Sequence, residues 1–371
     1  MHKACKNIIF LLLLVQTALF SDSVAEKYPV YSYVFSEFDV DESYIDNEDF
    51  EKFVQKNEKK IIHFYERSMQ RGEMLSPLIK GYLMNQGLSD LFIYLSMVES
   101  GLSTDIVSSK KAVGLWQFMP ATAQHYKLEV CNSFDERCDP ISATNAAIAY
   151  LNKLHAEFGR WYLAAIAYNC GEGRLHRAIR EAGSDALEIL TDERDRYLPK
   201  ETRNYIRKIL LTAMIGEGKF IDYSVRSEEN NEKLVRVEIS GGTDLEKLAK
   251  TLKMKPIALI SMNKQFKRGI VPDDKSLYTL MIPEAKMIRF YLKYELKETQ
   301  RQFKPNLISH IVQMGDTLES IAKTYHSSVE EIKAANNLED DFLELGAILL
   351  VPVSRKTFEA TLRTLQEGKR I

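Results

Sequence analysis

The segment WYLAAIAYNC, residues 161–170, constrains the fold more than any other, because almost all of its side chains are apolar. A helix that is hydrophobic on every side has to be enclosed by other elements. Apolar side chains recur at helical spacing in residues 143–158 and 199–216, so these segments can supply the enclosing helices. The sequence therefore predicts a mainly α domain, at residues 75–222, that is built around the 161–170 helix.

A second apolar helix carries a carboxylate near its end. Ser89 is placed to cap this helix, and Gly101 is placed to end it. Glu99 follows Leu95 by four residues and Phe92 by seven, so the three side chains share one face. Burial against apolar side chains raises a carboxyl pKa, because the charged form is disfavoured there. Glu99 is therefore either a solvated charge at a helix end or a proton donor in a partly dry site.

Two other stretches carry side chains that could contact a ligand, and those of the first suit an N-acetylated sugar. GLWQFMP contains Gln117, whose amide both donates and accepts, and Met119, an adaptable apolar side chain. AYNCGEGR places Tyr168 and Asn169 where the apolar helix ends. An N-acetylated sugar needs both polar and apolar contacts. Taken alone, however, each of these residues is also explained by a turn or by packing in the core.

The charge balance and the N-terminus limit the classes of partner. Fifty basic side chains nearly balance fifty-two acidic ones, so no overall field favours nucleic acid or an anionic membrane as the main partner. Lys3 and Lys6 precede an apolar run, and small residues follow at Ser23 and Ala25. This pattern predicts a secretory signal over residues 1–25, with an uncleaved membrane anchor as the alternative.

Export would place the cysteines in an oxidising compartment. Cys131 and Cys138 flank the polar loop NSFDER, and we expect them to close it as a disulfide, with two free thiols as the alternative. Cys170 then has no partner. The sequence has neither a Cys/His nucleophile pair nor the spacing of a zinc site, so we predict no metal and no cofactor.

The C-terminal part contains an internal repeat. VRVEISGGTDLEKLAKTLKMKPIALISMNKQF can be laid over SHIVQMGDTLESIAKTYHSSVEEIKAANNL, and each copy closes on a strand that ends in proline. Each copy reads as a βααβ module. We place these modules at 233–285 and 306–354, with a charged linker at 286–305 between them and a tail at 355–371 after them. Before the α domain, residues 26–74 form an acidic, aromatic segment that we expect to be extended or loosely packed to about Phe50.

Three motifs in this order resemble those of the lytic transglycosylases of bacterial cell walls: VESGLSTDIVSSKKAVGLWQFMP, AYNCGEGR and LPKETRNYIRKI. These enzymes are similar in fold to goose-type lysozyme. The C-terminal modules resemble LysM peptidoglycan-binding modules, the second clearly and the first in a degenerate form without the GDT turn. The domain order is similar to that of the membrane-bound D type, but no lipid-attachment cysteine follows the signal.

The resemblance implies a role for each matching residue. It makes Glu99 the single catalytic acid/base. The matching residues that hold the glycan or lie beneath the cleft are Ser108, Gln117, Met119, Tyr168, Asn169, Glu201 and Tyr205. In the second LysM module, the residues that match the family's N-acetylglucosamine site are Gly315, Asp316, Thr317, Leu318 and Asn336.

A single acid/base implies help from the substrate. Retaining glycosidases generally use two carboxylates about 5 Å apart, and Asp105 is the only other acid soon after Glu99. We therefore expect the substrate's own acetamido group to assist cleavage of the MurNAc–GlcNAc β-1,4 bond, leaving a 1,6-anhydro end. A hydrolytic muramidase and a non-catalytic wall-binding protein are the alternatives. The expected partners are periplasmic peptidoglycan strands and possible machinery of wall synthesis or division, but no nucleic acid.

Overall fold

The computed structural model describes residues 23–227, 233–296, 306–336, 338, 340–343, 346–354 and 357. The chain divides into two compact units, residues 1–295 and 296–371. Most of the predicted signal, at 1–25, and nearly all of the predicted tail, at 355–371, lie outside the described residues. Within the described ranges, no helix is both long enough and apolar enough to cross a membrane.

The N-terminal segment is helical and well packed, so the prediction of an extended or loosely packed segment was wrong. Its elements are α1 (Val24–Lys27), α2 (Tyr31–Glu37), the 3-10 helix η1 (Glu42–Asp46) and α3 (Glu48–Gly72). Phe35, Phe38 and Phe50 are fully buried, and the rings of Phe35 and Phe50 lie 6.1 Å apart. The elements before α3 are too short to produce a helical periodicity in the sequence, although their aromatic side chains fill a core.

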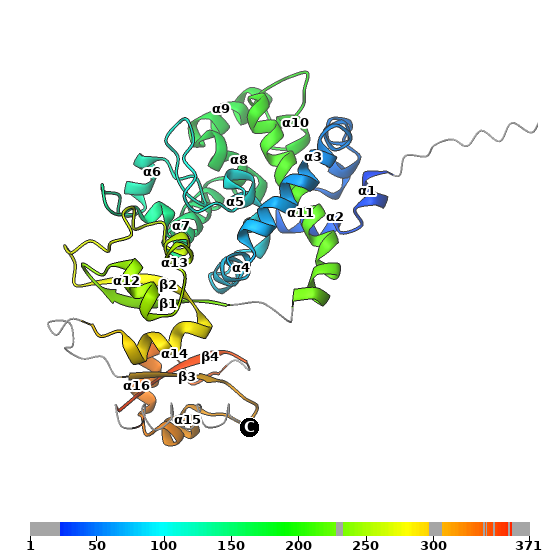
Figure 1. The fold of residues 1–371 in the computed structure, drawn as a ribbon. Coiled ribbons are helices and arrows are strands. Elements are labelled where there is room, and N and C mark those ends of the chain that lie inside the picture. The colour runs from blue at the N-terminus through cyan, green and yellow to red at the C-terminus, as the bar shows by residue number, and fades with distance from the viewer. Residues whose placement is uncertain are drawn as a thin grey trace, which may run out of the picture. The chain divides into compact units, whose positions relative to one another are not determined.

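The predicted mainly helical fold is confirmed, and helices enclose the apolar segment. Its elements are α4 (Ser76–Asn85), η2 (Asp90–Phe92), α5 (Ile93–Ser100), α6 (Pro120–His125), η3 (Glu136–Cys138), α7 (Pro140–Phe158), α8 (Trp161–Cys170), α9 (Glu172–Ala182), α10 (Leu187–Leu190) and α11 (Lys200–Ser227). Residues 162–167 of α8 are buried, and α7, α9 and α11 pack against it. Figure 1 shows these helices gathered around α8 and α5.

Local capping sets the ends of the helices that position the candidate site. The Ser89 hydroxyl accepts a hydrogen bond from the Leu91 amide at 3.3 Å, and Gly101 closes α5 in a left-handed conformation with φ 62°. The prediction for Gly101 is thus confirmed, whereas Ser89 caps the preceding 3-10 helix η2, and α5 begins after Phe92 without a side-chain cap. Helix α7 begins three residues before the expected Ala143, because Asp139 accepts hydrogen bonds from the Ile141 and Ser142 amides.

Both C-terminal modules have the predicted βααβ order. The first contains β1 (Leu234–Ser240), α12 (Leu245–Thr251), α13 (Pro256–Met262) and β2 (Leu277–Pro283), and the second contains β3 (Asn306–Ile311), α15 (Leu318–Tyr325), α16 (Val329–Asn336) and β4 (Ile348–Val353). In each module the two strands pair antiparallel, from Leu234 opposite Pro283 in the first and from Asn306 opposite Val353 in the second. The repeat read from the sequence is confirmed.

An asparagine side chain ties the second helix to the closing strand in both modules. Asn263 donates to the carbonyls of Leu259 and Met281 at 2.9 and 2.8 Å, and accepts from the Met281 amide at 2.7 Å. Asn336 makes the same three bonds, each at 2.7 Å, with the Ile332 carbonyl and with the Leu350 carbonyl and amide. Each copy is therefore held together internally by the same asparagine clamp, formed by Asn263 in the first module and by Asn336 in the second.

The start of the predicted linker belongs to the first module. Helix α14 (Glu284–Lys293) follows β2 directly, and Phe290 on it is 2% exposed in the core of that module. The prediction of a linker from residue 286 was therefore wrong for this part of the chain, because the apolar face of α14 completes the core. Residues 297–305 lie outside the described residues.

The three described cysteines are free thiols. Cys131 is exposed, whereas Cys138 is buried in the η3 turn. The structure therefore contradicts the expected disulfide between them. The chain between the two turns back on itself, since the Cys131 amide bonds to the Phe134 carbonyl at 2.7 Å, and the two thiols face different surroundings.

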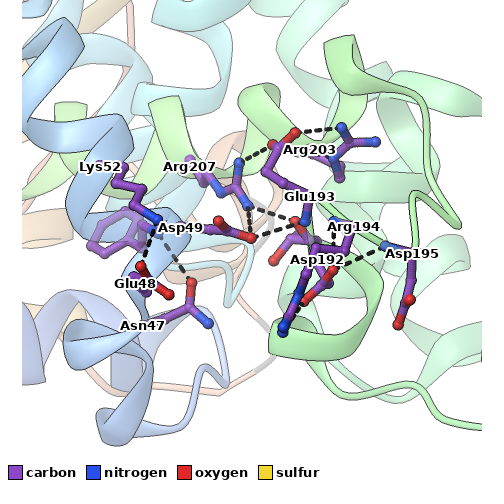
Figure 2. Close-up of polar contacts among 12 residues, drawn as sticks. Asn47, Glu48, Asp49, Lys52, Asp192, Glu193, Arg194, Asp195, Arg203 and Arg207 are labelled. Atoms are coloured by element: carbon purple, nitrogen blue, oxygen red, sulfur yellow. Dashed lines mark hydrogen bonds and ion pairs between the residues drawn. The ribbon is translucent and has the colours of Figure 1, made fainter.

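An ionic network fixes α11 to the N-terminal segment (Figure 2). The guanidinium groups of Arg203 and Arg207 are almost wholly buried, and they donate to the Glu193 carboxylate at 2.6 and 2.7 Å. Asp49, in the first turn of α3, accepts from the Glu193 amide at 2.8 Å and lies 3.8 Å from Arg207. Hydrogen bonds from Arg203 and then Arg207 lower the pKa of Glu193 to about 2.

We expect Glu193→Gln to destabilise the protein at neutral pH, because two buried guanidinium groups lose their counter-charge. The loss should be about 2 kcal/mol, less than for a fully enclosed pair because Glu193 is 37% exposed. Since the folded pKa is lowered from 4.5, the difference from wild type should be full above about pH 4.5 and should shrink as the pH falls towards about 2.

Urea unfolding at several pH values measures this difference, and Glu188→Gln, an exposed acid on α10, is the matched control. A constant difference between pH 7 and pH 2, or an equal loss in the control, would contradict the assignment.

Candidate functional site

Glu99 lies in the last turn of α5, and its carboxyl is partly buried. The Tyr205 hydroxyl donates a hydrogen bond to Oε1 at 2.6 Å. Burial is the main cause that raises the pKa of Glu99 to about 7, and the charge of Glu201 adds to it, while the Tyr205 hydrogen bond and the Lys208 charge oppose it. Glu99 is therefore not a freely solvated charge at a helix end. The carboxyl can hold a proton and release it near neutral pH.

One face of α11 supplies the groups around this carboxyl. Glu201, Tyr205 and Lys208 follow one another at helical spacing, and all three act on Glu99. Arg203 and Arg207, on the other side of the helix, form the network of Figure 2. The same network that fixes α11 therefore determines where the Tyr205 hydroxyl points.

Lys208 is a site residue that sequence reasoning missed. Its ammonium lies 3.9 Å from the centroid of the Phe64 ring, and burial lowers its pKa, while the neighbouring Glu99 charge acts in the opposite direction. The one signal in the sequence is its position three residues after Tyr205. Spacing alone did not separate it from the other basic residues of this helix.

Tyr168 and Asn169 connect the end of α8 to two other parts of the site. The Tyr168 hydroxyl donates to the Trp116 carbonyl at 2.8 Å, and its pKa is raised by burial and then by the Glu99 charge. Asn169 accepts a hydrogen bond from the Thr202 hydroxyl, at the start of α11, at 2.9 Å. The structure thus brings Tyr168 close to Glu99 and fixes Asn169 beside the helix that carries Tyr205.

Residues 103–119, here called the 103–119 loop, carry the three remaining predicted contacts, and their polar atoms largely shape the loop itself. Ser108 accepts from the Ala112 amide at 3.0 Å, and the Gln117 amide donates to the Gly114 carbonyl at 2.9 Å. Met119 is 42% exposed. Ser96 and Ser100 of α5 both donate to the Leu115 carbonyl, at 3.0 and 2.8 Å, so the loop is fastened to the helix that carries Glu99.

A row of tyrosine rings extends from Tyr168 and was not predicted. The centroids of Tyr168 and Tyr150 lie 5.1 Å apart, and those of Tyr150 and Tyr126 lie 5.2 Å apart. Burial raises the pKa of Tyr150 to about 12, so its hydroxyl stays protonated. These rings come from α6, α7 and α8 or the residues next to them, so no local pattern in the sequence connects them.

In the second module, the predicted glycan residues mainly shape a turn. Asp316 accepts from the Gln313 amide and from His310, both at 2.7 Å, and Thr317 caps α15 through the Ser320 amide at 3.1 Å. Leu318 is buried, and Gly315 has φ 93°. Asn336 forms the asparagine clamp with Ile332 and Leu350. Over the described ranges of both units, no group of three or more His, Cys, Asp or Glu side chains is placed to hold a metal ion.

Family models match three parts of the chain. The transglycosylase SLT domain matches residues 77–190, the LysM-like domain of lytic transglycosylase MltD matches 233–299, and the LysM domain matches 310–352. The chain carries an SLT domain followed by two LysM-type domains. Glu99 and the predicted residues up to Asn169 lie inside the SLT match, whereas Glu201 and Tyr205 lie just beyond it.

Three known proteins are similar to parts of this chain. Membrane-bound lytic murein transglycosylase D of Escherichia coli (strain K12) is 28% identical over 291 residues, 76% of this chain and 64% of that protein. Peptidoglycan transglycosylase gp16 of Escherichia phage T7 is 35% identical over 123 residues, 33% of this chain and 9% of that protein. The solved 70 kDa soluble lytic transglycosylase SLT70 of Escherichia coli is 21% identical with a TM-score of 0.36, and the match covers 54% of this chain and 31% of that one.

These matches confirm the predicted resemblance and the predicted fold class, an SLT-type helical domain followed by two LysM-type modules. The chain spans 64% of the length of transglycosylase D of Escherichia coli.

We expect Glu99→Gln in the SLT domain to be more stable than wild type at alkaline pH. The folded pKa of Glu99 is about 7 against an ordinary 4.5, so the stability that protonation provides is full below about pH 4.5 and is lost as the pH rises through about 7. Glutamine has the shape of the protonated acid and does not ionise. The variant should therefore gain roughly 2 to 3 kcal/mol over wild type at pH 8.5 and nothing at pH 4.5.

Both tryptophans of the chain, Trp116 and Trp161, lie in the SLT domain, so their fluorescence reports its unfolding in urea. Glu181→Gln, an exposed acid on α9, is the control and should show no such pH dependence. Equal stability of Glu99→Gln and wild type at pH 8.5 would mean that the ionised carboxyl is not desolvated.

Proposed function

We propose that this protein is a peptidoglycan lytic transglycosylase that cleaves the β-1,4 bond between N-acetylmuramic acid and N-acetylglucosamine without consuming water. The observation that carries the proposal is one carboxyl, Glu99, with a pKa of about 7 and a tyrosine hydrogen bond, inside an SLT domain. The printed names of the relatives, a lytic murein transglycosylase and a peptidoglycan transglycosylase, support the same substrate.

The first step is proton donation. At neutral pH a substantial fraction of Glu99 is protonated, and it donates its proton to the glycosidic oxygen as the bond to C1 breaks. The negative charge of Glu201 favours this protonated form. Once the proton has left, the Tyr205 hydroxyl and the Lys208 charge stabilise the carboxylate, so the group is balanced between its two states.

The second step relies on the substrate, because Asp105, the next acid after Glu99 in the sequence, is already in an ion pair. Asp105 is paired with Lys264 at 3.0 Å and is 47% exposed. Burial by itself would raise the pKa of Asp105, but Lys264 and Ser103 lower it overall, so it stays ionised and paired. In our proposal the 2-acetamido oxygen of the substrate bonds to C1 as the leaving group departs.

The final step regenerates the acid. The Glu99 carboxylate removes the proton of the C6 hydroxyl of the same muramic acid, and that oxygen bonds to C1 while the acetamido oxygen leaves. The product ends in a 1,6-anhydro ring. Glu99 recovers the proton that it donated, so neither water nor an external base is consumed.

We further infer that the chain acts in the periplasm, supported by the basic and apolar pattern of its first 25 residues and by the membrane-bound, murein-degrading relative. Machinery of wall synthesis or division remains a predicted partner. A muramidase that uses water in place of the C6 hydroxyl is the nearest alternative activity.

Mass spectrometry of the muropeptides released from purified peptidoglycan tests the activity. Wild type should release fragments with anhydro ends, which are lighter by one water than hydrolysis products. Glu99→Gln should lower the rate by about 100-fold or more, because it removes the only group assigned to both proton transfers. Reducing ends from wild type would establish the hydrolase instead, and full activity of Glu99→Gln would remove Glu99 from the mechanism.

We also propose that the second LysM module binds the glycan through its Gly315 to Leu318 turn. Asp316→Ala removes the bonds to Gln313 and His310 that shape this turn, so co-sedimentation with insoluble peptidoglycan should weaken about tenfold. Glu330→Ala, an exposed acid at the start of α16, is the control. Unchanged sedimentation of Asp316→Ala would contradict the proposed binding turn, and it would leave the chemistry at Glu99 untouched.

A further inference from the structure

The first LysM-like module is fastened to the helical domain along residues 129–139, here called the clamp loop. The Asp135 amide donates to the Gln265 carbonyl at 3.0 Å, and the Lys267 amide donates to the Ser133 carbonyl at 3.0 Å. Between these bonds, Phe134 and Phe266 form an antiparallel bridge. The contact is therefore a short piece of β-ladder between the helical domain and the segment that follows α13.

The clamp loop also places a side chain inside the module. The ring of Phe134 is 6% exposed and lies 5.4 Å from Phe266 and 5.2 Å from Tyr278, within the module's hydrophobic core. Two ion pairs, Arg236 with Asp139 at 3.5 Å and Lys275 with Glu129, connect the same surfaces. The core of the module is thus incomplete without the helical domain.

A buried ion pair extends this contact to the 103–119 loop. Asp135 is 2% exposed, and it binds Arg137 through two bonds of 2.9 Å and Lys267 at 3.3 Å. Arg137 in turn donates to the carbonyls of Lys111 and Phe118 at 3.3 and 3.4 Å.

The clamp loop also approaches the 103–119 loop at Gly114. A Cβ on Gly114 would lie 1.8 Å from the Arg137 carbonyl oxygen, so only glycine permits this approach. Together with the two bonds from Arg137, this contact holds the 103–119 loop at three points.

The module also reaches the 103–119 loop directly. Lys264, the residue after Asn263, pairs with Asp105 at 3.0 Å, and Ser103 donates to the same carboxylate at 3.2 Å. Because Asp105 lies near the start of the 103–119 loop, the module holds that loop there as well as through Arg137.

In the first module, backbone hydrogen bonds within the module close the turn before α12. Residues 242–245 correspond to the Gly315 to Leu318 turn of the second module. Here the Leu245 amide bonds to the Gly269 carbonyl at 2.9 Å, and the Val271 amide bonds to the Thr243 carbonyl at 2.9 Å. Among the described residues of the second module, no backbone hydrogen bond joins the turn at 313–318 to residues 338 or 340–343.

We propose that the first LysM-like module is a fixed brace for the 103–119 loop, with Lys264 and Lys267 as positioning residues that act on glycan affinity through Asp105 and through the Asp135 and Arg137 pair. This role rests on the proposed function only in its effect on glycan binding. The bracing itself is a property of the folded chain, and it can be measured without substrate.

Hydrogen exchange of the full-length protein, read by mass spectrometry, tests the bracing. Lys264→Glu places two carboxylates side by side, so the amides of residues 106–118, which include the Gly114 bond to Ile106, should exchange at least about threefold faster. Helix α8 should exchange as in wild type, which shows that the domain remains folded. Lys255→Glu, an exposed lysine of the same module with no ion pair in the described part of the chain, is the control.

Kinetics on soluble, uncross-linked glycan strands test the consequence. Lys264→Glu should raise KM about fivefold or more and leave kcat within about twofold, and the double variant Asp105→Lys with Lys264→Glu should restore both KM and the exchange rates. Unchanged exchange in Lys264→Glu, or failure of the reversed pair to restore it, would overturn the brace. An inactive wild type with the expected exchange pattern would instead reject the proposed function and leave the brace standing.

Discussion

The partly buried carboxyl of Glu99 is the constraint on which the rest of the site depends. A carboxylate without full hydration destabilises the fold whenever it is ionised, so its surroundings have to stabilise both states without favouring either strongly. Tyr205 and Lys208 stabilise the charge, while burial and Glu201 oppose it, and the resulting pKa of about 7 lies at the working pH of a general acid/base. The pKa of Glu99 thus follows from a balance of opposing contributions rather than from one strong contact.

Side chains of α11 determine much of this pKa balance, and the two sides of the helix make different contacts. One side carries Tyr205 and Lys208 towards Glu99, and the other inserts Arg203 and Arg207 into the network with Glu193. A small rotation of this helix would break the ionic network and move the Tyr205 hydroxyl at the same time. The N-terminal segment, which supplies Asp49 to the network and the Phe64 ring beside Lys208, is therefore part of the support for the site.

The sequence was sufficient where a feature is local. The buried character of α8, the Gly101 end of the helix with Glu99, and the repeated βααβ modules all follow from periodicity, capping and repetition. It was insufficient where the determining contact joins distant residues. Nothing around Phe134, in a polar loop, indicates that its ring completes the core of a module more than a hundred residues later.

The same limit explains the other differences. Helices α1 and α2 are too short to give a periodic pattern, and the apolar face of α14 is hidden among charges that resemble a linker. The free thiols of Cys131 and Cys138 depend on how the intervening loop turns, which cysteine spacing does not report. The predicted contacts Ser108 and Gln117 lie in the expected loop, but their bonding within it becomes visible only in three dimensions.

The asparagine clamp shared by the two modules has a consequence for how such units can diverge. Asn263 and Asn336 make the same three bonds, although the turns of the two modules differ in sequence and in how they are closed. The bonds that hold each module together therefore lie apart from the turn that we propose as the glycan contact. A duplicated copy can lose its affinity for sugar, keep its shape and become scaffolding, so an array of such units need not have as many binding sites as it has repeats.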